Sequence, residues 1–195
     1  FIADQFSVVP DKQVCFMPGP RESINLPFLE DALSVERQED KIEKTTHTVW
    51  LTSKRAPRDL PERYRKWLEN SVRKNPDFKH WLWTNDKDLL SADTIKALEA
   101  EGVEIKEVKK ALDPSKMRNS VPYEQALREE KFADASDALR LEVVFQHGGF
   151  YKDTDYEMLH PFRLLHKMYD SYSGAEPWGT FIGNAAFGAR KYHPF

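Results

Sequence analysis

One segment, residues 132–159, constrains the fold more than any other because a helical pattern passes directly into a strand pattern. Apolar residues recur at helical spacing in its first half, and Gly148-Gly149 predicts the end of that helix. The residues from Phe150 to Tyr156 then predict a β-strand, whose side chains alternate between two faces. We therefore expect Asp153 and Asp155 to point the same way at the end of the strand, where paired carboxylates favour a cation.

Upstream of this segment, strand and helix patterns alternate. β-Branched and aromatic residues mark the strands, whereas apolar residues at helical spacing mark the helices. The expected order is a strand at 45–51, a helix at 60–74, a strand at 78–84, a helix at 91–101, a strand at 103–108 and a helix at 123–131. This alternation predicts an α/β fold with parallel neighbouring strands. Ligands of such sheets lie beyond the carboxyl ends of the strands, so Trp50 and Asp153 should share one edge.

The chain divides into an N-terminal part, residues 1–44, and a domain formed by residues 45–195. Residues 1–27 contain prolines and little periodicity, which predicts an irregular arm or a short hairpin. Residues 26–44 are charged and helix-permissive with sparse apolar points, which predicts a surface helix. Near the other end, the small residues of 179–189 predict a strand that lets a neighbouring backbone approach closely.

Charge and cysteine content disfavour several classes of protein. The formal net charge is only −3, with basic and acidic residues interspersed, so bulk electrostatics give no reason to expect a nucleic-acid partner. Cys15 is the single cysteine and cannot form an intramolecular disulfide, which favours a reducing compartment. The sequence shows neither an apolar run long enough to span a membrane nor a signal-peptide pattern. We expect a cytoplasmic protein, or one delivered into a host cytosol if it is an effector.

Asp153 and Asp155 supply the smallest set of carboxylate ligands with which a hard divalent cation commonly binds a protein. Mg²⁺ and Mn²⁺ often bind one or two carboxylates together with the phosphates of a nucleotide. Taken alone, the spacing is just as typical of an acidic strand end that is merely solvated. Asp137 and Arg140, at i and i+3 on the preceding helix, can face the same site or simply form a salt bridge.

Two other chemistries of closely spaced aspartates fit the sequence less well. Phosphatases that form an aspartyl phosphate carry Thr where this chain has Glu157. A calcium-binding loop needs a glycine at its turn and a closing acid at a fixed distance, and both are absent here. Neither of these two chemistries therefore fits the sequence, and the cation site and the solvated strand end both stay open at this point.

Several blocks, in a fixed order, resemble a known family. Ser-Asp-x-Leu-Arg at 136–140 is followed by Gly-Gly-x-Tyr-x-Asp-x-Asp at 148–155, and His-Thr-Val-Trp at 47–50 precedes both. A further block, Asn-Pro-Asp followed by Leu-Trp-Thr, occupies 75–84. Together they are similar to metal-dependent sugar-nucleotide transferases with a DXD motif, which include glycosyltransferase family 32 and the clostridial glucosylating toxins. The resemblance extends over residues 45–195.

This resemblance implies a GT-A-type nucleotide-sugar-binding fold, with a mixed, mostly parallel sheet flanked by helices. It also implies a retaining transfer of a hexose or N-acetylhexosamine from a nucleotide diphosphate sugar, with a UDP-sugar favoured. Matched position by position, Val49 and Trp50 would hold the nucleobase, Trp50 by stacking. Asp137 and Arg140 would contact the donor sugar, and Tyr151 would lie against ribose or phosphate.

The same resemblance places a cation, Mn²⁺ or Mg²⁺, at the two aspartates. Asp153 would bind ribose or a metal-bound water, and Asp155 would bind the metal directly. A divalent cation neutralises the charge that develops on a leaving diphosphate, so with Asp137 and Arg140 these residues form the expected catalytic set. The residue before the first aspartate is commonly apolar in this family, whereas here it is Lys152, which we expect to face outward as a surface charge.

The acceptor is expected to be a protein or a glycan. The motifs are compatible with a toxin or effector that modifies a host protein, a bacterial polysaccharide or glycolipid transferase, and a non-catalytic nucleotide-sugar-binding module. Related domains continue past the segment around Asn184, so we expect this domain to be C-terminally incomplete, with Asn184 and His193 as candidates for completing the site. His47 is expected to be a hydrogen-bonded core residue, and Trp178 to line the site from a loop.

Overall fold

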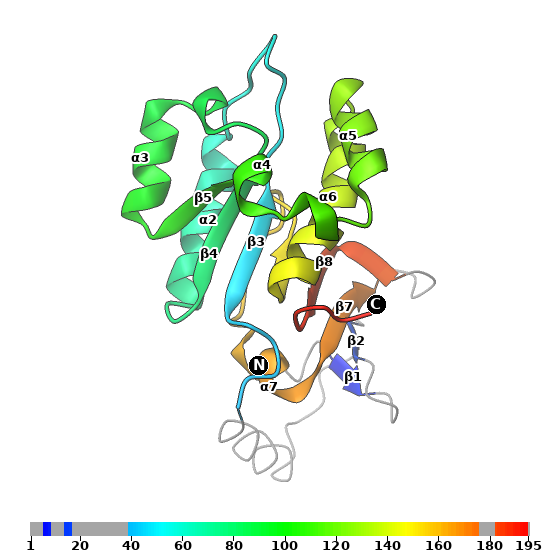
Figure 1. Ribbon diagram of the computed structural model, residues 1–195. Coiled ribbons are helices and arrows are strands. Elements are labelled where there is room, and N and C mark those ends of the chain that lie inside the picture. The colour runs from blue at the N-terminus through cyan, green and yellow to red at the C-terminus, as the bar shows by residue number, and fades with distance from the viewer. Residues whose placement is uncertain (1–5, 9–13, 17–38, 176–181, 195) are drawn as a thin grey trace.

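A computed structural model describes residues 6–8, 14–16, 39–175 and 182–194 (Figure 1). Its centre is a six-stranded sheet with the strand order β5-β4-β3-β6-β8-β7. The strands are β3 (Thr45–Val49), β4 (Lys79–Thr84), β5 (Val103–Glu107), β6 (Gly149–Lys152), β7 (Ser171–Ala175) and β8 (Ile182–Ala189). β3 pairs in parallel with β4 and β6, and β4 with β5, whereas β8 runs antiparallel to β6 and β7. The α/β fold with a mixed, mostly parallel sheet is therefore confirmed.

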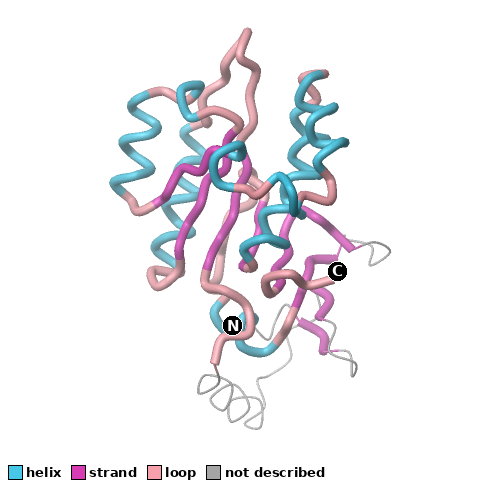
Figure 2. Tube along the Cα trace, in the orientation of Figure 1, coloured by secondary structure: helices cyan, strands magenta, loops and turns pink. Residues whose placement is uncertain are grey.

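Helices cover both faces of this sheet (Figure 2). α5 (Ser120–Arg128) and α6 (Phe132–His147) pack on one face, and α6 lies in front of the sheet in Figure 1. α2 (Glu62–Lys74) and α3 (Ala92–Ala100) pack on the other. The connections contain α4 (Val108–Ala111), α7 (Arg163–Met168), and the short 3₁₀ helices Lys87–Leu89 and Pro114–Lys116. We call the side covered by α6 the front face and the side covered by α2 the back face.

Side-chain alternation along the central strands separates two cores. Trp83 of β4 packs on the front face in a cluster with Leu139 of α6. Leu82, the preceding residue, packs on the back face with Leu68 of α2 and Leu98 of α3. Full burial of such a side chain stabilises the fold by about 1.5–3 kcal/mol. A shift of one residue in the register of β4 would exchange the two sets, so the pattern specifies the register.

The junction between α6 and β6 depends on two glycines. Gly148 and Gly149 have φ values of 68° and 101°, in the region that residues with a Cβ rarely adopt. A Cβ at Gly149 would also collide with the carbonyl oxygen of Thr45 on β3. The chain can therefore leave α6 and enter β6 directly beside β3 only with glycine here, as the predicted end of the helix requires.

The strand predicted over 179–189 is present as β8 within the described residues, and its small side chains do allow a close approach. A Cβ at Gly188 would lie 2.5 Å from the ring of Tyr172 on β7. α7 and β7 follow β6, and neither was among the elements expected from the sequence. Neither element has a strong local pattern, because both are short.

The N-terminal part contains one described hairpin. β1 (Phe6–Val8) pairs antiparallel with β2 (Val14–Phe16), which matches the hairpin that the sequence allowed. Most of the helix predicted over 26–44 lies outside the described residues. Its last part, residues 39–44, is not helical, and that part of the prediction is wrong. There the N–H groups of Lys41 and Ile42 both donate to the carbonyl of His166, at 2.8 and 3.1 Å, so pairing with α7 replaces the helix.

Candidate functional site

The carboxyl ends of β3 and β6 meet at one edge of the sheet. Thr46 lies opposite Phe150 and His47 opposite Tyr151, so the chain leaves both strands at neighbouring points. Trp50 and Asp153 therefore share this edge, as predicted. One expectation was wrong: β6 ends at Lys152, so Asp153 and Asp155 do not alternate along a strand. The Asp153 N–H still donates to the Ala185 carbonyl at 2.8 Å, and the chain then turns, with the Tyr156 N–H donating to the Asp153 carbonyl at 3.1 Å.

The carboxylate of Asp153 is fixed by two neighbours. The Tyr151 hydroxyl donates to its Oδ1 at 2.6 Å, and Nη2 of Arg140 lies 3.2 Å from the same oxygen. Tyr151 is fully buried on the front face, with the Arg140 guanidinium 4.9 Å from its ring centroid. Because Tyr151 is buried, it reaches the site through its hydroxyl and Asp153. The side chain of Asp153 keeps 26% of its surface exposed, so it remains open to a ligand.

Arg140 connects three elements. Its Nη2 pairs with Asp137 one turn earlier on α6 at 2.8 Å, and its Nη1 donates to the carbonyl of Asn184 on β8 at 2.9 Å. The Arg140 side chain is only 7% exposed, whereas Asp137 is 53% exposed. The amide of Asn184 also approaches Asp137, at 3.4 Å. Asp137 and Arg140 thus form the salt bridge that was one alternative, and Arg140 also contacts Asp153, so the pair lies at the same edge of the sheet.

The electrostatics at Asp153 suit a cation. Burial raises the pKa of the Asp153 carboxyl, and the charges of Asp155 and Asp137 raise it further, while the Tyr151 hydrogen bond and Arg140 lower it in part. Burial also raises the pKa of the Tyr151 hydroxyl, so Tyr151 stays protonated and donates. A carboxylate whose charge is costly gains from a nearby divalent ion. The all-oxygen donor set of Asp153 and the exposed Asp155 fits Mn²⁺ or Mg²⁺.

Side chains of the described residues alone do not supply all the ligands of such an ion. Within the described ranges, no cluster of three or more His, Cys, Asp or Glu side chains is placed to hold a metal ion. Mg²⁺ and similar ions commonly bind one or two carboxylates and take their remaining ligands from phosphate and water. The carboxylates of Asp153 and Asp155 match the number of protein ligands that such an ion commonly takes when phosphate and water supply the rest.

A cavity of about 580 Å³ opens beside these residues, a volume in the range of small-molecule sites. It is lined by Val49, Trp50, Leu51, Thr52, Ser53, Arg55, Ala56, Arg58, Glu130, Phe132, Ala133, Ser136 and Thr154. Trp50 is held in place because its indole N–H donates to the Arg58 carbonyl at 3.0 Å and its ring meets Tyr64 edge-on. Val49 is buried with its side chain in the front core and forms part of the wall.

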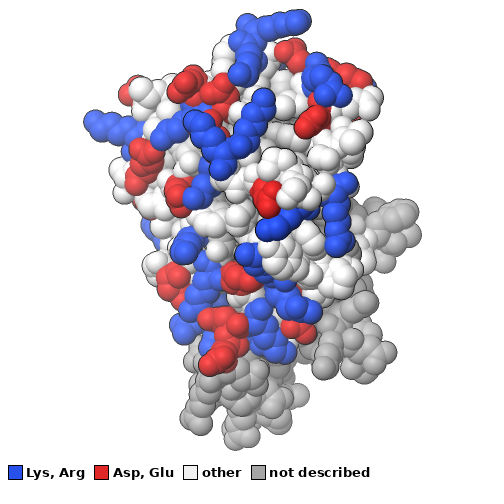
Figure 3. Space-filling view, viewed as in Figure 1, with Lys and Arg blue, Asp and Glu red and all other residues white. Residues whose placement is uncertain are grey.

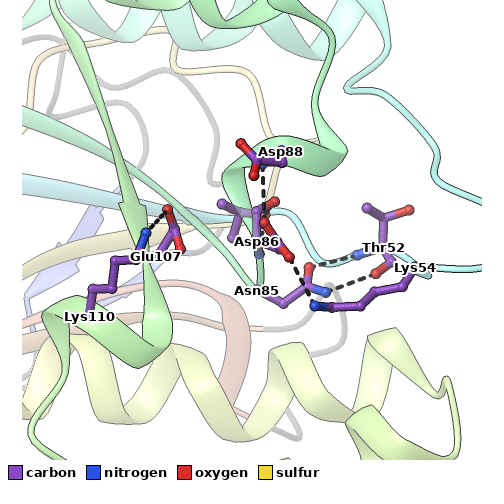
Figure 4. A network of polar contacts seen from close by, with 8 residues as sticks. Thr52, Lys54, Asn85, Asp86, Asp88, Glu107 and Lys110 are labelled. Carbon is purple, nitrogen blue, oxygen red and sulfur yellow. Dashed lines mark hydrogen bonds and ion pairs between the residues drawn. The ribbon is translucent and has the colours of Figure 1, made fainter.

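A polar network supports the loop that borders this cavity (Figure 4). The side chain of Asn85 accepts from the Thr52 N–H at 3.1 Å and donates to the Thr52 carbonyl at 2.9 Å. Lys54 pairs with Asp86 at 2.9 Å. These contacts tie the start of the loop after β3 to the end of β4. A second cavity of about 540 Å³ adjoins the first and shares Thr52, Ser53, Arg55, Glu130 and Phe132 with it.

Some lining residues carried no usable signal in the sequence. Ser53 donates to Glu130 at 2.6 Å and links the loop after β3 to the turn between α5 and α6, across 77 positions of sequence. No local pattern predicts such a pair. Arg55 and Arg58 fell in a predicted loop without an assigned role. Ser136 could have been noted, because it directly precedes Asp137 in the Ser-Asp-x-Leu-Arg block.

Other candidate residues are placed as follows. His47 is a core residue, as expected: the Trp83 indole donates to its Nδ1 at 3.0 Å, so its Nε2 carries the proton and donates to the Gly148 carbonyl at 2.7 Å. Asn184 joins the Arg140 cluster. His193 lies instead near the C-terminal half of α6, since the preceding Tyr192 N–H donates to the Phe145 carbonyl at 2.8 Å. Trp178 lies outside the described residues.

Lys152 departs from the expectation of an outward charge. It faces away from Tyr151, on the back face, but is only 1% exposed. Its ammonium donates to the carbonyl of Tyr156 at 3.0 Å. The expectation was wrong because the back face of β6 is covered by the chain that follows the turn, with Met158 buried against it.

This fold and this edge define a class of protein. A mixed α/β sheet that carries a nucleotide-sized cavity and acidic side chains beyond its carboxyl ends is the arrangement of a GT-A-type nucleotide-sugar-binding domain. The chain belongs to the family described as "Glycosyltransferase sugar-binding region containing DXD motif", whose model matches residues 61–175, more than half of the chain. The family resemblance found in the sequence is confirmed.

Individual relatives are bacterial toxins. A protein named "Toxin" from Photorhabdus asymbiotica is 30% identical over 124 residues, which cover 60% of this chain and 4% of that protein. "Toxin Afp18" from Yersinia ruckeri is 29% identical over 142 residues, which cover 67% of this chain and 6% of that protein. The chain thus spans a small fraction of the length of these relatives. The solved structure of the PaToxG glycosyltransferase shares the fold, with a TM-score of 0.65 at 23% identity, covering 85% of this chain and 61% of that one.

Two surface properties complete the description. Lys and Arg side chains are interspersed with Asp and Glu across the face shown in Figure 3, without a continuous field of one sign. In the part of the chain that the structure describes, no helix combines the length and the apolar character needed to cross a bilayer.

Proposed function

We propose that this chain is a metal-dependent, retaining glycosyltransferase domain. It moves a hexose or N-acetylhexosamine from a nucleotide diphosphate sugar, with UDP-sugars favoured, to an acceptor. The observation that carries this proposal is the convergence of Asp137, Arg140 and Asp153 at the carboxyl edge of the sheet. The adjoining cavity, lined by Val49 and Trp50, has a volume that suits a nucleotide.

The nucleotide end of the donor binds at β3. Trp50 offers a ring whose position is fixed by Arg58 and Tyr64, which suits stacking against a base because little conformational entropy is lost on binding. Val49 closes the wall behind it. Arg55 and Arg58 line the same cavity, so cationic side chains are available near a diphosphate.

The sugar end of the donor binds at α6. Asp137 is half exposed and can accept hydrogen bonds from sugar hydroxyl groups, while Arg140 holds it in place. Tyr151 acts through Asp153, because burial keeps its ring away from ribose and its hydroxyl already donates to that carboxylate. Asp137, Arg140, Asp153 and Asp155 form the proposed catalytic set.

The cation binds at the turn after β6, with Asp155 as a direct ligand and Asp153 as a ligand of the ion, of its water or of ribose. When bound, Mn²⁺ or Mg²⁺ would neutralise charge on the leaving diphosphate. The chain's own part is to hold the two carboxylates in place. Tyr151 and Arg140 orient Asp153 through Oδ1.

The acceptor is a protein or a glycan. The named relatives are toxins, which favours a host protein as the acceptor and a role as a toxin or effector domain in a host cytosol. A bacterial polysaccharide or glycolipid transferase is the alternative acceptor class. An experiment distinguishes the two acceptor classes: the domain is incubated with a radiolabelled sugar donor and either a eukaryotic cell lysate or bacterial glycans. The acceptor class is the one in which the labelled sugar is then found.

The test of the activity is nucleotide release from a panel of UDP- and GDP-sugars, measured by mass spectrometry with and without MnCl₂. We expect release with at least one donor, its loss in EDTA, and a fall of at least about 100-fold in Asp153→Asn with Asp155→Asn. Asp134→Asn, an exposed aspartate in the first turn of α6, is the matched control and should retain activity. NMR of the product's anomeric proton tests retention.

Two results would contradict the proposal. Donor binding by calorimetry without turnover against any acceptor would favour the non-catalytic binding module. Turnover that persists in EDTA and in the double Asn variant would remove the cation and both aspartates from the mechanism.

A further inference from the structure

The turn that carries Asp153 and Asp155 is held from the back face of the sheet. After Tyr156 the chain crosses to this face, where Met158 is buried against Phe150 and Leu165. Two asparagines of α2 and its C-terminal cap fasten that segment. Asn70 donates to the Met158 carbonyl at 3.0 Å, and the side chain of Asn75 accepts from the Phe162 N–H, also at 3.0 Å. Two positions of the segment after the crossing, Met158 and Phe162, are thus anchored to α2 and its cap.

Lys152 is the anchor nearest to the aspartates. It is the last residue of β6, its side chain is 1% exposed, and its Nζ donates to the Tyr156 carbonyl at 3.0 Å. Since the Tyr156 N–H donates to the Asp153 carbonyl, Tyr156 closes the turn from one side and Lys152 from the other. The pair of contacts fixes the four residues from Asp153 to Tyr156 as a unit.

A buried ammonium at this position is costly. At 1% exposure the charged group of Lys152 is withdrawn from water, which costs free energy even though the carboxylates of Asp153 and Asp155 lie close by. His80 of β4 faces the same region and cannot compensate, because burial lowers its pKa and it is already engaged by Asn75 and Thr46. An apolar side chain would avoid this cost, so stability alone does not account for a lysine here.

We propose that Lys152 is a positioning residue for the cation site: from the face opposite the ligand, it holds the Asp153–Tyr156 turn in the shape that presents both carboxylates to one ion. This inference rests on the proposed function, in which these aspartates bind the ion. Its physical basis is that residues which orient metal ligands without touching the metal commonly change metal affinity by about 10–100-fold when they are removed.

The test is Lys152→Met, which keeps the length and apolar stem of the side chain and removes the donor and the charge. We expect Mn²⁺ affinity, measured by EPR in the presence of saturating UDP, which supplies the diphosphate ligands, to weaken by about tenfold. We expect the melting temperature without metal to stay unchanged or rise, because the variant no longer buries an ammonium. A purely structural role would instead lower the melting temperature, so the two readouts separate positioning from folding.

A second measurement does not depend on metal. Hydrogen exchange of the metal-free protein should show faster exchange at the Tyr156 amide in Lys152→Met than in wild type, because the turn loses its anchor. Lys152→Gln, a neutral side chain that retains a donor, should fall between the two and remains informative if the Met variant does not fold. Lys96→Met, at an exposed position on α3, is the control and should match wild type in both measurements.

The possible failures are distinguishable. If wild type binds no Mn²⁺ even with UDP present while the turn still loosens in Lys152→Met, the proposed function fails and the anchoring by Lys152 stands. If wild type binds Mn²⁺ but Lys152→Met binds it equally or more tightly, with unchanged exchange at Tyr156, then Lys152 is only a nearby repelling charge and the inference is overturned.

Discussion

Arg140 is the residue through which α6, β6 and β8 meet. Its guanidinium contacts Asp137, Asp153 and the Asn184 carbonyl from a position that is only 7% exposed. Lysine would keep the positive charge but lacks the planar guanidinium, whose several N–H donors contact different partners at the same time. We expect Arg140→Lys to lower the free energy of unfolding by about 2 kcal/mol, the scale of one lost hydrogen bond to a buried charged group. We also expect it to reduce sugar transfer by about 100-fold.

Urea denaturation and donor turnover measure these two effects. Arg128→Lys on α5, whose side chain is 69% exposed, is the control and should change neither. If Arg140→Lys kept full stability and lost only activity, Arg140 would act on the donor alone rather than on the arrangement of the site.

The hydroxyl of Tyr151 tests the orientation of Asp153 separately. Tyr151→Phe removes one buried hydrogen bond of 2.6 Å while retaining the ring in the front core. We expect a loss of about 1 kcal/mol in the free energy of unfolding. We expect about a tenfold fall in kcat/KM, because Asp153 is then held by Arg140 alone. Tyr169→Phe, in the cluster on the back face, is the control for deleting a tyrosine hydroxyl.

Among the elements, the junction of α6 and β6 sets the position of the aspartates. Gly102 and Gly149 both have positive φ, at 89° and 101°, but their surroundings differ. A Cβ at Gly102 would meet nothing within 4 Å, whereas one at Gly149 would strike the Thr45 carbonyl of β3. We expect Gly102→Ala to cost about 1–2 kcal/mol, from backbone strain alone. We expect Gly149→Ala to cost more than about 3 kcal/mol, because β3 and β6 must also separate.

Thermal unfolding followed by circular dichroism measures both glycine variants. A Gly149→Ala protein as stable as Gly102→Ala would show that β6 can move away from β3 at little cost. Donor binding by the surviving Gly149→Ala protein would then report whether the aspartates depend on that contact.

The elements with long apolar patterns were predictable, including the approximate positions of their ends, whereas the end of β6 was not. α2, β4, α3, β5 and α6 carry enough periodic positions to be read from the sequence alone. The end of β6 at Lys152 depends on where β8 stops pairing, about 35 positions further along the chain, and local sequence does not contain that information. The burial of Lys152 was also missed, because the segment that covers it folds back from further along the chain and local sequence does not show this.

At the scale of the whole molecule, sheet order brings together what sequence order separates. The candidate site draws on β3, α6, the turn after β6 and β8. The α/β pattern indicated that the ends of β3 and β6 share an edge, and the family motifs added α6. It could therefore be predicted that Trp50, Asp137, Arg140 and Asp153 lie near one edge of the sheet. Their supports, such as Glu130 with Ser53 and Asn75 with Phe162, could not, because each pair joins distant segments without a recurring pattern.

The two faces of the sheet each bury a neutral histidine, which makes the stability of the whole fold depend on pH. Burial lowers the pKa of His47 to about 3 on the front face and that of His166 to about 4 on the back face. In the unfolded chain both would titrate near their ordinary value of about 6.5. Between that value and the lowered pKa the unfolded state binds more protons, so the free energy of unfolding falls as the pH falls.

We expect a loss of about 1.4 kcal/mol per pH unit for each histidine over the window from about pH 6.5 down to 4. His166→Gln should reduce this slope by about 1.4 kcal/mol per pH unit, the contribution of one histidine. The variant also loses the contact of His166 with the Tyr172 hydroxyl at 2.9 Å, so its free energy of unfolding is lower at every pH. His160→Gln, at an exposed position, should leave the slope unchanged. Urea titrations at pH 7.5, 6 and 5 measure the slopes. Equal slopes in wild type and His166→Gln would mean that His166 becomes protonated without unfolding, and that the back face opens to admit the proton.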